Sequence, residues 1–300
     1  AGIPHSIFEN TAMSKIRKTL RIGITTGDIN GIGPELIIRA FEDTRIKEMF
    51  TPIIYGSPRV LNIYRKVLSI EKFSYNTIEQ PNQAAPKKVS LIDCINMQDR
   101  VDIGIANERG GKAALESLEA AVKDLKSGEL DALVTMPIDK STIQGDKFDF
   151  PGHTEYLAKT FETSEYMMFM ISDFLKIGVV TGHVPLKDVV NHISTKGILE
   201  KIRIMDKTLR MDFNIERPVI AVLGINPHAG DNGLLGKEDK EKVERAIELI
   251  TELRGPETLK AHLIKVRDDE TMHVALAWET LAWLTQDMSS EALDELSVAF

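Results

Sequence analysis

The sequence has one cysteine, no long apolar run and no run of basic residues, and each lack excludes a class of protein. Cys94 alone can form neither an intramolecular disulfide nor a thiol-based metal site, which is typical of a reducing compartment, so we expect a cytoplasmic protein. No apolar stretch approaches the roughly 20 residues that a membrane-spanning helix needs, so we expect it to be soluble. The net charge of −8 disfavours nucleic acids and anionic membranes as partners.

What is present is enough for a sizeable core. The 300 residues are 43% apolar, which suits one large domain or two of ordinary size. The first 13 residues lack the basic start and long apolar stretch of a secretory signal. We therefore expect residues 1–13 to be an N-terminal extension ahead of a natural start at Met13, without a role in any chemistry.

From Leu20 onward, short β-branched runs alternate with Gly-containing loops and segments of helical period. This alternation predicts an α/β fold with a mostly parallel sheet covered by helices. Beyond Glu257 the alternation stops and two helices are expected. The predicted strands are Leu20–Thr25, Pro52–Tyr55, Val89–Asp93, Ala132–Met136, Ile177–Thr181 and Val219–Leu223, and the predicted helices are Gly111–Lys126, Glu238–Leu253, Thr271–Gln286 and Ser290–Phe300.

The first segment that points to chemistry is IGITTGDINGIGPELIIRAF, residues 22–41. A strand there enters a loop with three glycines, and Pro34 stands where a first helical residue would. Such a turn aims backbone N–H groups and a helix N-terminus at the carboxyl edge of the sheet, where an anionic ligand could bind. The spacing fits neither G-x-G-x-x-G nor a Walker loop, so a plain strand-to-helix turn is an equal interpretation.

Two further loops place potential proton carriers close together in the sequence. VTMPIDKSTI contains Asp139 and Lys140, and FPGHTEYLA contains His153, Thr154 and Glu155. Lysine and histidine can bind a carboxylate or phosphate and move protons, and threonine adds a neutral hydrogen bond. The alternative for a lone histidine after glycine is a role in hydrogen bonding within its own loop.

Two more histidines each follow an apolar strand. His183 stands in VVTGHVPLKDV, and His228 stands in VIAVLGINPHAGDNGLLG. Histidines presented past the carboxyl ends of strands are placed as ligands of a shared divalent cation would be. The alternative is two unrelated loop histidines. Imidazole suits several divalent metals, and the pattern does not choose among them.

In this order, the GDINGIGPE, MPIDK, PGHTEYLA, TGHVPLKDV and LGINPHAGDNGLLGKED segments resemble the signature motifs of the 4-hydroxythreonine-4-phosphate dehydrogenase family. The resemblance covers about Leu20 to Arg254. It implies a fold similar to isocitrate dehydrogenase, with two α/β lobes, helices on both faces of the sheet, and an active site in the cleft of a homodimer. On that basis residues 14–145 with 255–300 would form the first lobe, and residues 146–254 the second.

The resemblance also implies roles for particular side chains in the GDINGIGPE, MPIDK and PGHTEYLA segments. His153 and Thr154 would contact the substrate, and Lys140 and Asp28 would be catalytic residues near the cleft. The implied reaction is NAD- or NADP-dependent oxidation of the secondary alcohol of 4-phosphohydroxy-L-threonine, a step of pyridoxal phosphate biosynthesis. The ketone formed lies β to a carboxylate, so carbon dioxide is lost afterwards. The residues that bind the nicotinamide cofactor are left unassigned.

The metal site is likewise implied by the resemblance. His183 and His228 would be two of three histidines that hold zinc, magnesium, cobalt or manganese, with ligands from both subunits. Such a cation would favour deprotonation of the alcohol and stabilise the negative charge that then develops.

The chain departs from the family pattern at one point. The family's third metal histidine belongs to a YHDQG motif, which this sequence lacks. Two alternatives therefore stand beside the leading interpretation. One is a paralogue acting on a phosphorylated sugar acid of the threonate or erythronate type, and the other is a catalytically silent family member. Acyl transfer to phosphate on a related fold is disfavoured, because that chemistry has no use for a histidine-bound cation.

Overall fold

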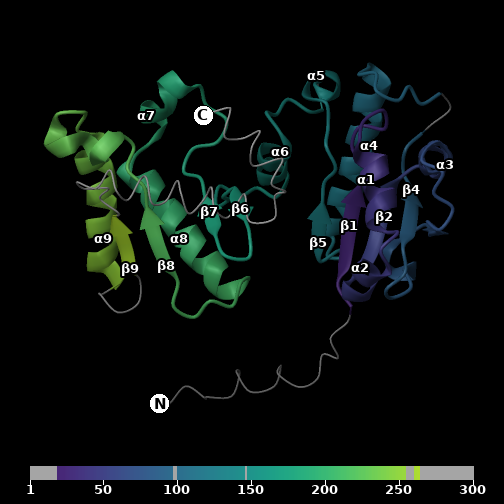
Figure 1. Ribbon diagram of the computed structural model, residues 1–300, viewed down its shortest axis with the longest axis horizontal. Helices are drawn as coiled ribbons and strands as arrows, with labels where there is room; N and C mark the ends of the chain where they lie inside the picture. The colour runs from purple at the N-terminus through teal and green to yellow at the C-terminus, as the bar shows by residue number, and fades with distance from the viewer. Residues whose placement is uncertain (1–18, 97–99, 146, 255–259, 264–300) are drawn as a thin grey trace, which may run out of the picture. The chain divides into compact units, whose positions relative to one another are not determined.

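The computed structural model describes residues 19–96, 100–145, 147–254 and 260–263, which fall into two compact units divided between Thr163 and Ser164 (Figure 1). The expected N-terminal extension and the two helices expected at 271–286 and 290–300 lie outside the described residues. The lobe limits taken from the resemblance stay a prediction.

The first unit is built on a five-stranded sheet in the order β3-β4-β2-β1-β5, in which every pair of neighbours is parallel. Parallel pairing requires a crossover between successive strands, and helices supply it (Figure 1). The carboxyl ends of β1 and β5 therefore lie side by side, because these strands are direct neighbours. The strands are β1 Arg21–Thr25, β2 Thr51–Gly56, β3 Asn76–Ile78, β4 Ser90–Asp93 and β5 Ala132–Val134.

Helices cover both faces of this sheet, as the alternation along β2 shows. Ile54 packs in one apolar cluster with residues of α1 and α3, whereas Ile53 and Tyr55 pack on the other face with Ala121 of α4. All six residues of β2 are buried, so the sheet centre lies wholly within the core. The helices of this unit are α1 Gly33–Ala40, α2 Thr44–Met49, α3 Pro58–Val67, η1 Pro81–Gln83, α4 Glu108–Lys126, α5 Lys140–Ile143 and α6 His153–Thr160.

Helix α4 confirms the helix predicted at Gly111–Lys126 and begins three residues earlier. Asn107 caps it, because its side chain accepts a hydrogen bond from the Gly110 N–H. Its buried stripe of Ala114, Leu118, Ala121 and Val122 faces the sheet and the neighbouring helices. Two lysines in its last turn complement the negative end of the helix.

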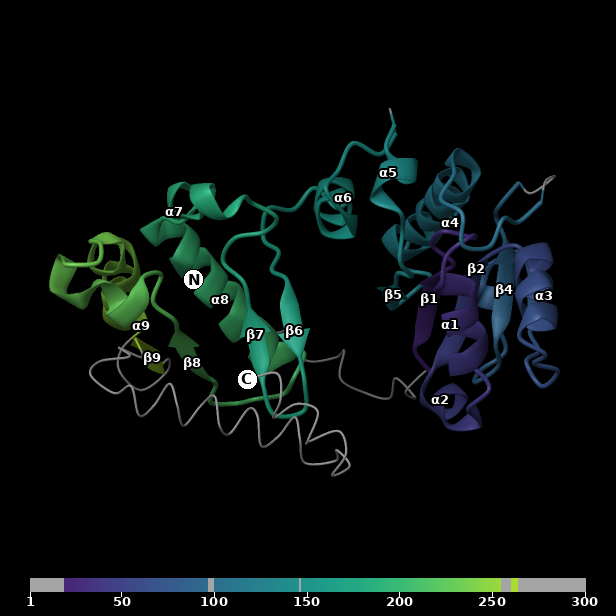
Figure 2. The same cartoon turned by 45° about the horizontal axis from the view of Figure 1, so that its top comes forward.

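The second unit is organised around α8, whose buried Ile198, Ile202 and Leu209 pack on Ile220 of β8 and on the helical segment after it. Strands β6 and β7 form an antiparallel hairpin (Figure 2), and β8 pairs in parallel with β9. The elements are β6 Phe169–Ile171, β7 Lys176–Gly178, η2 Leu186–Asp188, α7 Val189–His192, α8 Thr195–Met211, β8 Val219–Val222, η3 Pro227–Gly233, η4 Asp239–Glu244, α9 Arg245–Arg254 and β9 Lys260–Leu263.

Two predicted elements of the second unit differ from the observed ones. The strand predicted at Ile177–Thr181 ends at Gly178 and is antiparallel to β6, because a short hairpin pairs it locally. The helix predicted at Glu238–Leu253 is divided into the π-helical turn η4 and the α-helix α9. The predicted fold class, α/β with a mostly parallel sheet and helices on both faces, is confirmed. Among the described helices, none has the length and apolarity that crossing a membrane requires.

Candidate active site

The loop that follows β1, residues 26–32, is held from several sides. The Thr26 N–H donates to Ser117 Oγ of α4 at 3.0 Å. The Tyr64 hydroxyl of α3 donates to the carbonyls of Ile29 at 3.0 Å and Gly31 at 2.8 Å. A buried backbone group without a partner is costly, so these bonds fix the path of the loop. These hydrogen bonds thus hold the glycine-rich loop in one conformation at the carboxyl end of β1.

Asp28 is buried at the centre of this loop. Its Oδ1 accepts from the Asn30 N–H at 2.8 Å, and its own N–H donates to the Pro137 carbonyl at 3.0 Å, which joins the loops after β1 and β5. A Cβ on Gly110 of α4 would lie 2.3 Å from Oδ1, so the glycine lets the helix approach the carboxylate. Burial raises the pKa of Asp28, the Asn30 bond opposes that rise, and the negative charge of Asp139 adds to it. The contacts shown are those of a residue that holds the loop, and its catalytic role stays a prediction.

The loop after β5 leads directly into α5, which Asp139 caps. The Asp139 carboxylate accepts from the backbone N–H groups of Ser141 at 2.8 Å and Thr142 at 3.1 Å, and from the Ser141 hydroxyl at 2.5 Å. These bonds, with that of the Ser141 side chain largest, lower the pKa of Asp139. Lys140, the first residue of α5, is exposed, so its ammonium group is available to an incoming anion.

Helix α6 begins with the two predicted substrate-binding residues. His153 and Thr154 are its first two residues after the N-cap Gly152. The His153 Nε2 is buried and has no hydrogen-bond partner within the part of the chain described here. Burial and then the positive charge of Lys140 lower the pKa of His153, so the ring is neutral at pH 7 and lies within electrostatic reach of that lysine.

Together these features suit a small anion that also carries a hydroxyl group. The first turn of α6 offers backbone N–H groups and the positive end of a helix dipole. Lys140 adds a full positive charge, and the neutral His153 ring can donate or accept a hydrogen bond at Nε2. All four predicted residues lie in the first unit: Asp28 in the loop after β1, Lys140 at the start of α5, and His153 and Thr154 at the start of α6.

The two predicted metal ligands lie in the second unit. His183 follows β7 by five residues and His228 follows β8 by six, and both side chains are exposed. In the described part of the chain, no group of three or more His, Cys, Asp or Glu side chains is placed to hold a metal ion. Their role as metal ligands stays a prediction.

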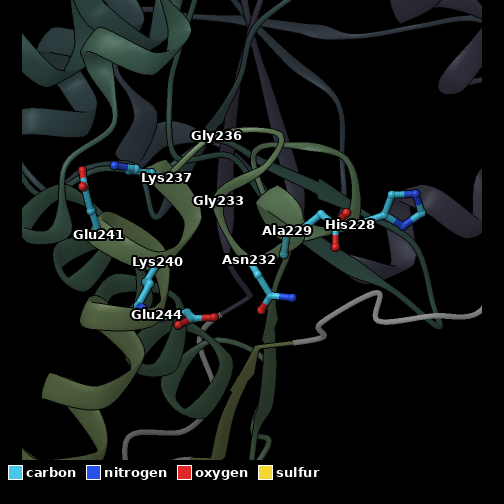
Figure 3. A pocket seen from close by; sticks show the side chains of 10 residues that line it. His228, Ala229, Asn232, Gly233, Gly236, Lys237, Lys240, Glu241 and Glu244 are labelled. Carbon is cyan, nitrogen blue, oxygen red and sulfur yellow. The ribbon is translucent and has the colours of Figure 1, made fainter.

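A pocket of about 560 Å³ opens beside His228 in the second unit. Figure 3 shows the His228 ring pointing away from the side chains of Lys240 and Glu244. The charges around the pocket are mixed, which does not favour one sign of ligand. Its lining consists of His228, Ala229, Asp231, Asn232, Gly233, Gly236, Lys237, Lys240, Glu241 and Glu244.

Two carboxylates with a clear structural part were not among the predicted site residues. The capping role of Asp139 could have been found, because an aspartate just before the short run Lys140–Ile143 is typical of a helix N-cap. Asp239, whose exposed fraction is 0%, could not, because it stands in the charged run KEDKEK, which is typical of a solvated surface.

The chain is similar to proteins that are named as dehydrogenases of phosphorylated hydroxy acids. It is 39% identical over 234 residues to 4-hydroxythreonine-4-phosphate dehydrogenase of Bacteroides thetaiotaomicron, covering 78% of this chain and 64% of that protein. It is 33% identical over 233 residues to D-threonate 4-phosphate dehydrogenase of Cupriavidus necator, covering 76% and 69%. The crystal structure of a 4-hydroxythreonine-4-phosphate dehydrogenase from Burkholderia phymatum superimposes with a TM-score of 0.68 at 30% identity, covering 82% of this chain and 74% of that one.

The chain thus spans less than two thirds of the length of the Bacteroides relative. The family described as "Pyridoxal phosphate biosynthetic protein PdxA" matches residues 48–259, which is more than half of the sequence. This match includes four of the five motif segments found above. The chain therefore belongs to the PdxA family.

Proposed function

We propose that this chain is a dehydrogenase of a phosphorylated hydroxy acid, dependent on NAD or NADP and on a divalent metal. Its first candidate substrate is 4-phosphohydroxy-L-threonine, as in the name of the Bacteroides relative. The observation that carries the proposal is the buried Nε2 of His153 in the first turn of α6, which has no hydrogen-bond partner among the described residues and feels the charge of Lys140, in a chain of this family. We further propose that the protein acts in the cytoplasm, in pyridoxal phosphate biosynthesis.

Substrate binding follows from the charges of the site. An acid that bears a phosphate carries two anionic groups, and the ammonium of Lys140 and the first turn of α6 each favour one. Thr154 adds a hydroxyl that can donate to either group. We expect His153 to contact the secondary hydroxyl, because its neutral ring is able to accept a proton there.

The chemistry requires a proton acceptor and a hydride acceptor. A nicotinamide cofactor, when bound, would supply the acceptor for the hydride of the carbinol carbon. His153 takes the hydroxyl proton at Nε2, which leaves a ketone β to the carboxylate. The bond from the α-carbon to the carboxylate then breaks, carbon dioxide leaves, and the enolate formed takes a proton from the protonated His153. Atoms and charges balance, and the ring returns to its neutral form.

The proposed metal ligands supply an incomplete donor set. The imidazoles of His183 and His228 are chemically suited to zinc or cobalt, and less so to manganese or magnesium, which prefer oxygen ligands. The described residues of one chain offer no third donor with them. We therefore propose them as two ligands of a site completed outside those residues, in a homodimer whose subunits share the site.

The second candidate substrate is a phosphorylated sugar acid. The name of the Cupriavidus relative, D-threonate 4-phosphate dehydrogenase, supports it. The two substrates differ in the group at the second carbon, an amine or a hydroxyl. A catalytically silent protein is the third possibility, because the YHDQG motif is missing.

One assay separates these three proposals. Purified protein is given 4-phosphohydroxy-L-threonine, D-threonate 4-phosphate or D-erythronate 4-phosphate with NAD or NADP and each metal, and reduced nicotinamide is followed at 340 nm. We expect turnover with one substrate class and its loss in His153→Gln. Absence of reduced cofactor in every combination would overturn the dehydrogenase proposal. Light scattering gives the oligomeric state of the same sample.

The metal proposal has a test that does not need turnover. Calorimetric titration with cobalt(II) should show binding to the wild-type protein and at least about a tenfold loss of affinity in His183→Ala and in His228→Ala. His192→Ala is the matched control, because that histidine is also exposed and lies in the same unit. Equal affinity in all four proteins would contradict the assignment.

A further inference from the structure

The segment that carries His228 has an unusual backbone. Five consecutive residues, 228–232, have positive φ between 42° and 83°, and four of them are not glycine. For a residue with a Cβ this left-handed conformation is unfavourable, somewhat less so for aspartate and asparagine. Such a run persists only where the surrounding structure holds it. Contacts from neighbouring residues must therefore stabilise this unfavourable backbone conformation.

Asp239 is the side chain placed to do so. It lies at the start of the π-helical turn η4, and it is fully buried. Its Oδ1 accepts from the Ile225 N–H at 2.7 Å, and its Oδ2 accepts from the Asn226 N–H at 3.1 Å and from Asn226 Nδ2 at 3.0 Å. One carboxylate thus receives three hydrogen bonds from the two residues that precede Pro227. Charged hydrogen bonds of this kind are about twice as strong as neutral ones.

Asn226 extends this contact into the left-handed run. Its Nδ2 also donates to Glu238 Oε2 at 3.0 Å, and its carbonyl accepts from the Ala229 N–H at 3.0 Å. His228 stands between Asn226 and Ala229, so the position of its Cα is set by a residue that Asp239 holds. Hydrogen bonds within the loop, such as that from the Leu235 N–H to the Gly230 carbonyl at 3.0 Å, close the turn but do not attach it to the body of the unit.

We propose that Asp239 is a positioning residue that fixes the segment 225–236, and with it the imidazole of His228, at the carboxyl end of β8. Its consequence for metal binding rests on the proposed function, whereas the positioning itself does not. A buried carboxylate with three donors is strongly favoured only while those donors remain in place, so the loop and Asp239 hold each other. Without the carboxylate, the left-handed run loses its attachment and the loop opens locally.

Asp206 of α8 provides a matched control. It is also a buried aspartate of the second unit, with an exposed fraction of 3%, but its Oδ1 accepts from Arg210 Nε at 2.9 Å within its own helix. A general weakening of the unit should follow from either change, whereas loop opening should follow only from a change at Asp239.

The experiment uses the full chain and the variants Asp239→Asn, Asn226→Ala and Asp206→Asn. Native-state cleavage by thermolysin is followed at Leu234 and Leu235, two exposed leucines of the loop, with the cut sites mapped by mass spectrometry. We expect cleavage there to rise about tenfold in Asp239→Asn, less in Asn226→Ala, and within twofold of wild type in Asp206→Asn, since about 1.4 kcal/mol of easier opening gives a factor of ten.

Cobalt(II) titration of the same proteins adds the functional readout, with affinity expected to fall about tenfold in Asp239→Asn. Unchanged cleavage in both Asp239→Asn and Asn226→Ala would overturn the proposal, as would an equal rise in Asp206→Asn. If Asp239→Asn does not fold, Asn226→Ala decides, because it keeps two of the three bonds to the carboxylate. Absence of cobalt binding by the wild-type protein would count against the proposed function and leave the cleavage test intact.

Discussion

Two glycine-rich loops follow strands β1 and β8, and they are held in opposite ways. The loop after β1 is buried and takes its partners from α3, α4 and the loop after β5. The loop after β8 is largely exposed, and its attachment converges on Asp239. Each loop carries residues predicted for the active site, so the difference bears on how each part of the site is kept in place.

The loop after β1 is held by hydrogen bonds from several elements, whereas the loop after β8 is held mainly by one carboxylate. Where many groups each contribute a hydrogen bond worth about 1 kcal/mol, removal of any one leaves the loop in place. Where one carboxylate accepts most of the bonds that attach a loop, as Asp239 does at Ile225 and Asn226, a single substitution should release the segment. The first unit should therefore lose stability in graded steps, whereas the second loop should open as a whole without unfolding its unit.

The largest effect in the first unit is expected from Gly111→Ala in α4. The added Cβ would lie 1.9 Å from the Thr142 carbonyl oxygen of α5, a backbone atom that cannot turn aside. Helix α4 must then move, and it carries Asn107 and Ser117, two supports of the loop after β1. We expect a loss of about 3 kcal/mol in the free energy of unfolding, measured by urea titration. Gly145→Ala is the control, because its Cβ would meet nothing within 4 Å; equal losses would contradict the steric argument.

The next effect is expected from Asn30→Ala. Asn30 is buried, its Nδ2 donates to Asn107 Oδ1 at 3.0 Å, and its Oδ1 accepts from the Asp102 N–H at 2.8 Å. Truncation leaves these partners without their bonds and opens a small cavity, so unfolding should become easier by about 2–3 kcal/mol. Asn82→Ala, at an exposed asparagine, should change the value by less than about 0.5 kcal/mol. A loss below 1 kcal/mol for Asn30→Ala would mean that support of this loop is even more widely shared.

The sequence predicted this first region better than the second for a physical reason. Buried parallel strands such as Thr51–Gly56 are continuous apolar runs, and long helices such as α4 show a clear apolar stripe. The hairpin of β6 and β7 has three-residue strands of mixed exposure, so nothing in its period sets the pairing direction. The π-helical turn at Asp239–Glu244 depends on tertiary contacts, which periodicity does not encode.

The candidate site shows the same limit. The motifs pointed to loops for His153, Thr154 and Lys140, whereas the structure places His153 and Thr154 in the first turn of α6 and Lys140 as the first residue of α5, two short helices that the sequence pattern did not predict. They did not reveal that the Asp28 carboxylate bonds within its own loop, although an aspartate that accepts from the N–H two residues on is typical of a turn. Nor could they show that Asp239 is buried, because burial of a charge depends on the donors that fold around it.

A smaller effect is expected from Tyr64→Phe. Its buried hydroxyl donates to the carbonyls of Ile29 and Gly31, and each carbonyl keeps a second lone pair for another donor. We expect the free energy of unfolding, measured by urea titration, to fall by about 1 kcal/mol, with no change in the rate at which thermolysin cleaves the loop. Tyr75→Phe should cost less, since its hydroxyl contacts the Pro58 carbonyl at the long distance of 3.4 Å. Cleavage within residues 26–32 of Tyr64→Phe would show that this loop, too, depends on one partner.

The smallest effect concerns the charge state of His153. Burial and then the Lys140 charge place its folded pKa below the ordinary value of 6.5, which the unfolded chain should show. Between these two values the unfolded chain binds more protons, so this residue makes the free energy of unfolding rise with pH up to about 6.5. Asp28 acts in the opposite sense at lower pH: its raised pKa means that the folded chain holds its proton longer, so stability from this group falls as pH rises above 3.8.

Titration of the His153 ring by NMR, assigned with His153→Gln, checks the direction. The pKa should lie below 6.5 and should rise in Lys140→Met, because removal of the nearby positive charge makes protonation easier. Since Lys140 is exposed, added salt should raise the wild-type value in the same direction and should have less effect on the variant. Lys147→Met, at another exposed lysine of the same unit, should leave the pKa unchanged. If Lys140→Met and Lys147→Met behave alike, Lys140 does not act on His153, and the anion-binding arrangement proposed for the first unit loses its positive charge.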